Sequence, residues 1–225
     1  MKYITKRPQP QALIAWTRAR TVEDKAQATT WSYDDMPANV REAVKTKLVA
    51  EQGGLCCYTG RRIDLQTSHI EHLKPQAICI NHEDTDYNNL IAAYPSSAPN
   101  TPGCRYGAHK KANWYEEELF VHPRRMDCEA RFRYRDTGKI MPTSPNDAAA
   151  TRTIQKLGLD DIELELMRKA AIDAAIYAKR LTKPQALRLL AEMDRRTSQD
   201  HFHEFCFVIK QACEKYLKRF ERPGD

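Results

Sequence analysis

The apolar positions in the first fifty residues recur at helical spacing. Val40, Val44 and Leu48 are each four residues apart, which places them on one face of a helix. We therefore predict an amphipathic helix over residues 40–52, ended by the two glycines that follow it. A shorter helix is predicted over residues 11–20, and polar residues and prolines separate the two.

The last eighty residues show the same spacing and contain no catalytic motif. Ser144 and Pro145 suit the N-cap and the first turn of a helix, and Gly158 separates that helix from the next. The predicted helices of this region span about residues 145–157, 160–181, 183–197 and 201–221.

The middle of the chain has shorter apolar runs and more turn residues. Its predicted elements are two short strands over 61–65 and 67–73, a polar loop over 81–88, an irregular connection over 94–107 and a helix over about 109–119. The fold class is predicted to be α+β and mostly helical. The predicted division is an N-terminal helical segment over 1–52, a central unit over 53–142 and a C-terminal helical region over 143–225.

Composition limits the possible partners and compartments. The 225 residues include 36 Lys and Arg against 30 Asp and Glu, a net charge of +6 that suits a phosphate-rich partner without proving one. The chain contains no run of ~18 apolar residues, so we expect no membrane span. The residues after Met1 include no apolar segment of the kind found in signal peptides, so we do not expect secretion. An odd count of seven cysteines favours reduced thiols, so we expect a cytoplasmic protein.

The candidate catalytic residues are concentrated in the central unit. They form the run Ser68-His69-Ile70-Glu71-His72-Leu73-Lys74-Pro75, then Asn89-Leu90, then Arg105-Tyr106-Gly107-Ala108-His109-Lys110-Lys111. Hydrolysis of a phosphodiester needs a base for water, a cation that stabilises charge on phosphorus, and groups that hold both in register. An acid beside a histidine, followed by an amide and by a histidine beside lysines, could supply these parts.

Each residue type suits a particular role. His72 suits the general base because the ordinary pKa of imidazole lies near ~6.5. Glu71 offers hard oxygen ligands for Mg²⁺ or Mn²⁺, and His109 is expected to be a second metal ligand within the catalytic set. Residues expected to bind phosphates are Arg105, Lys110 and Lys111.

Two nearby residues leave alternatives open. Asn89 is expected to orient the imidazole of His72 by bonding a backbone carbonyl near it, although Asn88 could do the same. Asn89 is preferred because Leu90 follows it. His69 lies three residues before His72 and competes as a metal ligand, although a core or surface role is favoured for it.

The ordered motif resembles that of HNH endonucleases. A wider pattern covers most of the chain: Leu48-x-x-Glu51-Gln52-x-x-Leu55-Cys56-x-Tyr58, the three motifs above, Ala150-Thr151-x-Thr153-Ile154-x-x-Leu157-Gly158-Leu159 and Leu166-x-Arg168. This pattern resembles PtuB, the HNH component of Septu-type and retron-associated anti-phage systems. The Thr-Ile-x-x-Leu-Gly-Leu segment favours this subfamily over HNH proteins in general.

The resemblance implies a fold, a reaction and partners. It implies a ββα-metal nuclease core between N-terminal helices and a C-terminal docking region, and a divalent cation, Mg²⁺ or Mn²⁺. The implied activity is cleavage of DNA or RNA, with tRNA among the candidate substrates, by a toxic effector of antiviral defence. The implied partner is a PtuA-type ATPase, joined in retrons by a reverse transcriptase and its msDNA.

The chain departs from the family pattern at the structural zinc. Many HNH proteins hold zinc with two Cys-x-x-Cys pairs, but here Thr59 and Gly107 stand at cysteine-like positions, leaving Cys56 and Cys104. Two thiolates do not make a closed tetrahedral site. We therefore expect no structural zinc, and packing around Tyr58 and Tyr94 in its place.

A second hypothesis belongs to a different class of protein. The chain could be a non-catalytic assembly subunit that keeps an HNH-like fold, because its long helical C-terminal region is a reasonable docking platform. Both hypotheses expect partner binding, and only the first expects metal-dependent cleavage. The complete set of Glu71, His72, Asn89 and His109 favours the first.

Overall fold

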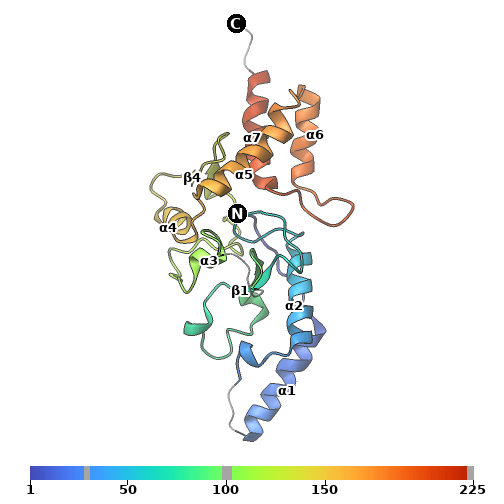
Figure 1. Cartoon of the computed structure of the whole chain (residues 1–225), viewed down its shortest axis with the longest axis vertical. Helices are drawn as coiled ribbons and strands as arrows, with labels where there is room; N and C mark the ends of the chain where they lie inside the picture. Colours follow the sequence, from blue (N-terminus) through green and yellow to red (C-terminus); the bar gives the residue numbers. More distant parts are fainter. Residues whose placement is uncertain (28–30, 98–102, 222–225) are drawn as a thin grey trace.

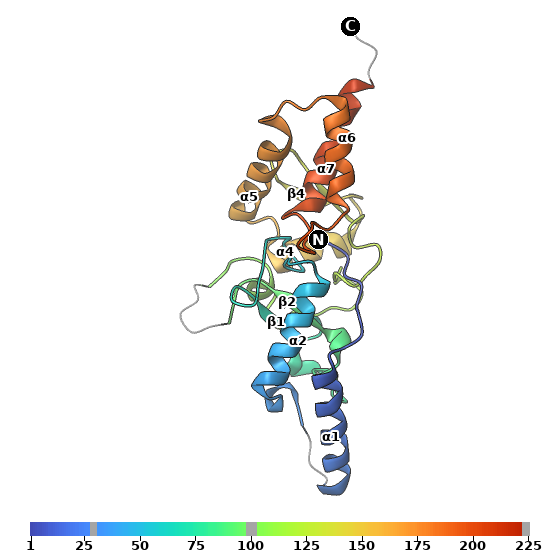
Figure 2. The same cartoon turned by 90° about the vertical axis from the view of Figure 1, so that its right-hand side faces the viewer.

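The computed structural model describes residues 1–27, 31–97 and 103–221 of the chain. Helices α1 (Gln11–Gln27) and α2 (Ala38–Glu51) pack together at one end of an elongated molecule (Figures 1 and 2). The C-terminal helices lie at the opposite end, and two small sheets lie between them. Helix α2 confirms the helix predicted over 40–52, and α1 continues well past the predicted end at residue 20.

The central sheet contains the strand that carries the catalytic motif. Strand β1 (His69–His72) pairs antiparallel with β2 (Leu90–Ala93), so that His72 lies opposite Leu90. The side chain of Gln52 bonds both backbone groups of Ala92, at 2.7 and 2.9 Å, on the other side of β2. Among the described residues β1 has no second strand beside it, so one edge of β1 is left without a partner strand.

Two predicted elements around this sheet are wrong. Residues 61–65 form no strand in the described structure: one isolated bridge, Leu55 to Arg62, occurs there, and the backbone N–H of Arg62 donates to the carboxylate of Glu204 at 2.9 Å instead of to a partner strand. The helix predicted over 109–119 is a single turn, α3 (Ala108–Lys111). It stops because Ala112 adopts a positive φ of 47°. Of the connection over 94–107, residues 98–102 lie outside the described residues.

A second hairpin was not predicted at all. Strands β3 (Phe132–Tyr134) and β4 (Ile140–Pro142) pair antiparallel across a turn at Gly138. The alternation of buried Phe132, exposed Arg133 and buried Tyr134 is the sequence signal that could have shown it.

The C-terminal helices follow the predicted order with shorter bounds. They are α4 (Ala148–Leu157), α5 (Ile162–Ile172) with a π-helical turn over Asp173–Tyr177, α6 (Lys183–Met193), and α7 (Cys206–Leu217) with a 3-10 turn over Lys218–Phe220. Other 3-10 turns span Tyr33–Asp35, Gln76–Ile78 and Tyr87–Asn89. The predicted cap at Ser144 is wrong, because Asp147 accepts the Ala150 amide at 2.8 Å and begins α4.

Buried apolar side chains from α1 to α7 form one cluster, which includes Leu13, Leu48, Leu90, Phe120 and Phe207.

The predicted division of the chain into three regions stays a prediction. No helix in the described ranges is both long enough and apolar enough to cross a bilayer.

We expect Gly138→Ala to destabilise the fold strongly. Gly138 has a φ of +85°, and a Cβ there would lie 2.0 Å from the carbonyl oxygen of Glu165 on α5. Backbone strain and this clash together should lower the free energy of unfolding by about 2 kcal/mol or more. Urea unfolding monitored by circular dichroism measures the change. Gly103→Ala is the matched control, because a Cβ there meets nothing within 4 Å. An unchanged midpoint for Gly138→Ala would contradict this packing.

Candidate active site

Strand β1 distributes the motif over its two faces. Side chains alternate along a strand, so His69 and Glu71 share one face while His72 lies on the other. Helix α3 adds His109 to the first face, where the rings of His69 and His109 have centroids 6.0 Å apart. The structure therefore brings Glu71, His69 and His109 together and directs His72 away from them.

Glu71 is a mostly buried carboxylate, 14% exposed, with three neighbours on its own face. Its Oε1 lies 3.0 Å from Nζ of Lys111 and accepts the Tyr58 hydroxyl at 3.3 Å, while its Oε2 lies 3.6 Å from Nε2 of His69. Burial opposes ionisation, but the hydrogen bond with His69 and the charge of Lys111 outweigh it and lower the pKa of Glu71. The carboxylate is therefore ionised at neutral pH.

Lys111 does not lie where a phosphate-binding residue was expected. It is only 2% exposed, and besides its pair with Glu71 it donates to the carbonyl oxygen of His72 at 2.9 Å. Its ammonium thus joins α3 to β1 instead of facing solvent. The other two expected phosphate ligands, Arg105 and Lys110, are exposed, and Arg105 pairs with Asp161 at 3.3 Å.

The rings of His69 and His109 have opposite hydrogen-bonding patterns. Nδ1 of His69 donates to the carbonyl oxygen of Pro95, because a carbonyl can only accept. Nδ1 of His109 instead accepts the backbone N–H of Cys104 at 3.2 Å. Burial lowers the pKa of His69, but its bonds to Glu71 and Pro95 outweigh this and raise it overall.

His72 lies on the opposite face with one ring nitrogen occupied. Its Nε2 donates to the carbonyl oxygen of Asp84 at 2.9 Å, and its ring packs edge-on against Tyr33 with centroids 4.6 Å apart. In a neutral ring this bond leaves the lone pair on Nδ1. Burial lowers the pKa of His72 below its usual value, which favours the neutral ring that a general base requires.

Asn89 braces the loop that holds His72. Its amide oxygen accepts from Lys74 N at 2.8 Å, and its nitrogen donates to the carbonyls of Lys74 at 3.0 Å and Glu83 at 3.1 Å. Glu83 precedes Asp84, the residue whose carbonyl oxygen bonds His72. Asn88 is exposed, and its backbone amide bonds Asp86. The side chain that fixes this loop therefore belongs to Asn89.

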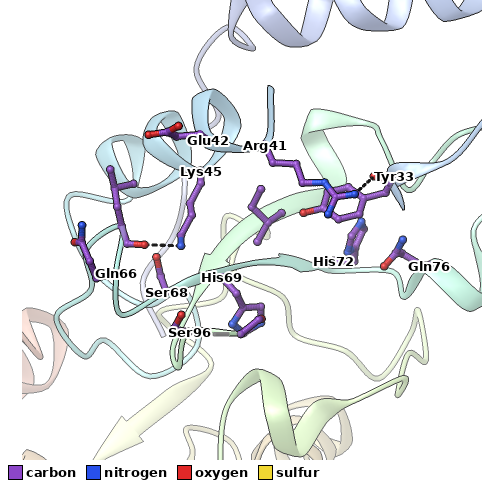
Figure 3. Close-up of a pocket in the computed structure, with 13 residues that line it drawn as sticks. Tyr33, Arg41, Glu42, Lys45, Gln66, Ser68, His69, His72, Gln76 and Ser96 are labelled. Atoms are coloured by element: carbon purple, nitrogen blue, oxygen red, sulfur yellow. Dashed lines mark hydrogen bonds between the residues drawn. The ribbon is translucent and has the colours of Figure 1, made fainter. Parts of the chain in front are cut away.

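A groove of about 710 Å³ gives access to both histidines of β1. His69 and His72 both line it, together with Arg41 and Lys45 from α2, and Figure 3 shows their side chains around the strand. The second face of β1 is therefore not isolated from the first. A phosphate in this groove could meet groups from both.

The cysteine-like positions of the family pattern also lie together. Sγ of Cys56 accepts the backbone N–H of Tyr94 at 3.4 Å, and a Cβ on Gly107 would lie 3.4 Å from Cγ2 of Thr59. Cys104 is half-buried. Across the part of the chain that the structure describes, no three His, Cys, Asp or Glu side chains are placed to hold a metal without movement. The expectation about zinc stays a prediction.

Sequence reasoning missed three of the groups that build this site. Tyr58 was considered only as packing, yet its hydroxyl bonds Glu71. Tyr33 was not singled out, although it packs on the ring of His72. The carbonyl of Asp84 left no signal in the sequence, because any residue can supply a backbone oxygen. Of these three groups, only Tyr58 had a sign in the sequence, because it is part of the Cys56-x-Tyr58 pattern.

A curated protein from Vibrio cholerae serotype O1 biovar El Tor is similar to this chain. Its name is "Retron Vc95 putative HNH endonuclease", and the two are 28% identical over 155 residues, which cover 64% of this chain and 70% of the relative. This similarity supports the HNH nuclease family. No family model matches the chain.

We expect Lys111→Met to lower the free energy of unfolding by roughly 3–5 kcal/mol. The substitution leaves the carboxylate of Glu71 buried without its cation, and breaking one side of a buried pair carries that cost. Chemical unfolding measures the loss. Lys110→Met is the matched control, because Lys110 is exposed and should change stability by no more than ~0.5 kcal/mol. Adding Glu71→Gln to Lys111→Met should recover part of the loss, and equal stabilities of the two single lysine variants would contradict the ion pair.

We expect Asn89→Ala to destabilise the protein by about 1–3 kcal/mol, because its backbone partners in the loop lose their hydrogen bonds. Asn88→Ala should cost no more than ~0.5 kcal/mol, because the side chain of Asn88 is exposed. Thermal and urea unfolding of both variants provide the comparison. A larger loss for Asn88→Ala would show that the wrong asparagine has been assigned.

Proposed function

We propose that this chain is an HNH nuclease that hydrolyses phosphodiester bonds with Mg²⁺ or Mn²⁺ as its cation. The observation that carries the proposal is the arrangement of Glu71 and His72. An ionised, nearly buried carboxylate and a histidine with a lone pair on Nδ1 are neighbours on one strand, beside a groove that His69 and His72 line.

His72 acts as the general base in this proposal. Its Nδ1 takes a proton from water, the oxygen of that water bonds phosphorus, and the bond from phosphorus to the leaving sugar oxygen breaks as that oxygen takes a proton from solvent. The carbonyl of Asp84 holds Nε2–H, and so fixes both the ring orientation and the nitrogen that carries the lone pair. Asn89 acts only through the loop, by holding the backbone on either side of that contact. Asn89 is therefore a positioning residue.

Glu71 is the carboxylate that would hold the cation. Its Oε1 is taken by Lys111 and Tyr58, while Oε2 faces His69 and the side of the site where His109 lies. A hard carboxylate oxygen suits Mg²⁺ or Mn²⁺. When bound, such a cation stabilises the negative charge that develops on the phosphate. The exposed side chain of Lys110 lies next to His109 on α3 and could meet a neighbouring phosphate.

The biological setting is also a proposal. We propose that the chain is a PtuB-type effector of anti-phage defence, restrained by a PtuA-type ATPase and associated in retrons with a reverse transcriptase and msDNA. The sequence resemblance and the retron in the relative's name support this. Ile162 and Leu166, each 58% exposed and four residues apart on α5, would suit docking of the ATPase. The substrate is DNA or RNA, because the chemistry acts on the phosphodiester that both share.

One observation favours the alternative of a non-catalytic assembly subunit. The ammonium of Lys111 already neutralises part of the charge on Glu71, and a cation must bind beside it. If that pair replaces the metal, the chain would bind its partners and nucleic acid without cutting. Cleavage assays separate the two functions.

We expect His72→Ala to reduce metal-dependent cleavage at least ~100-fold, the size of effect that loss of a general base produces. The purified chain, alone and with the ATPase, is incubated with DNA and with total RNA, in Mg²⁺, in Mn²⁺ and in chelator. His203→Ala is the control, because His203 lies outside the motif and outside the groove. Cleavage by His72→Ala at the wild-type rate would exclude His72 as the base. No cleavage in any arm would favour the assembly subunit.

A further inference from the structure

The two histidines that flank Glu71 are not equivalent as metal ligands. An imidazole binds a cation through a nitrogen that carries a lone pair, and the other nitrogen usually donates its N–H to a carbonyl or a carboxylate. The hydrogen bond at the second nitrogen therefore decides whether the first can bind. This rule can be applied to His69 and His109, because each has a bonded Nδ1.

His69 has the pattern of a metal ligand. Its Nδ1–H is held by the carbonyl of Pro95, so the nitrogen that faces Glu71 is Nε2, and a cation bound there displaces the Nε2 proton and meets the lone pair. That same Nε2 lies 3.6 Å from Oε2 of Glu71, the carboxylate oxygen that Lys111 does not occupy. The ring is mostly buried and lines the groove, so its orientation is fixed by packing as well as by the carbonyl.

The spacing of these two atoms suits a shared cation. Two ligands that each lie ~2.1 Å from a cation are about 3.0 Å apart in an octahedral shell and about 3.4 Å apart in a tetrahedral one. The separation of 3.6 Å between Nε2 of His69 and Oε2 of Glu71 would have to shorten by about 0.2 Å for the tetrahedral spacing and by about 0.6 Å for the octahedral one. Waters and a phosphate oxygen would complete the shell.

His109 has the opposite pattern. Because its Nδ1 accepts the N–H of Cys104, the proton of the neutral ring lies on Nε2, which is then a donor without a lone pair. This side chain is exposed, and the bond from Cys104 sets which nitrogen of its neutral ring carries the proton. In this state His109 suits a hydrogen bond to a phosphate oxygen better than a bond to a cation.

We propose that His69, together with Glu71, binds the divalent cation, and that His109 donates a hydrogen bond to the phosphate instead of binding the metal. The proposal rests on the proposed nuclease function, and it reassigns the nitrogen ligand from α3 to β1. His72 keeps its role, because its contacts are on the other face of the strand.

The test measures metal binding directly and does not depend on turnover. Mn²⁺ is titrated into the full-length chain and free Mn²⁺ is followed by electron paramagnetic resonance. Electron spin-echo envelope modulation then shows whether a ¹⁴N nucleus is bonded to the metal. The variants are His69→Ala, His69→Asn and His109→Ala, with His203→Ala as the matched control. His69→Asn keeps an N–H that can reach Pro95 but has no imidazole nitrogen, so it separates ligand loss from disruption of the strand.

We expect the wild type, His109→Ala and His203→Ala to show the same ¹⁴N coupling and similar Mn²⁺ affinity. Both His69 variants should lose the coupling and bind Mn²⁺ at least ~10-fold more weakly. Coupling that survives in both His69 variants, or that disappears in His109→Ala, would overturn the proposal. So would a wild type that binds Mn²⁺ without nitrogen coupling. Cleavage assays on the same samples separate failure of the His69 assignment from failure of the nuclease function. If only the assignment fails, the wild type still shows cleavage that depends on the metal and on His72.

Discussion

The buried ammonium of Lys111 is the contact on which the arrangement of the site depends. A charge so far from water needs acceptors, and it finds them in the carboxylate of Glu71 and the carbonyl of His72. Both acceptors belong to β1, while Lys111 is the last residue of α3. The ammonium group of Lys111 therefore fixes a four-residue helix, too short to be stable by itself, against the strand that carries the catalytic residues.

The same contact explains how the functional groups are shared between two faces. Holding α3 against β1 brings His109 towards His69 on the face of Glu71. The opposite face is arranged by the loop after β1, where Asn89 braces the backbone and Asp84 holds His72. The groove beside β1 and α2 is lined by His69 and His72, one from each face of the strand, while Glu71 lies next to His69 and outside the lining.

The sequence predicted the parts of this molecule that depend on local pattern. The helix over 40–52 has its apolar residues at regular spacing, and it is present as α2. The motif residues Glu71 and His72 do lie on a strand, inside the segment 67–73 that was predicted to form one. Asn89 is the amide inside the loop network, and its role as the orienting residue stays a prediction.

The errors arise where distant contacts override local preference. Residues 109–119 look helical, but Lys111 turns into the core and Ala112 leaves the helical region. The backbone N–H of Arg62, which a strand ladder would use, donates instead to the carboxylate of Glu204, far away in the sequence. The ring tautomers of His69 and His109 depend on the backbone groups of Pro95 and Cys104, which no sequence motif describes.

The most direct test of the central claim is the fate of the attacking water. The chain, with its ATPase, cleaves nucleic acid in water enriched in ¹⁸O, and mass spectrometry examines the phosphate at the new ends. Hydrolysis by water at a metal site requires one ¹⁸O in each new terminal phosphate, and no product when a chelator is present. Products that form in chelator, or that carry unlabelled cyclic phosphates, would contradict the account.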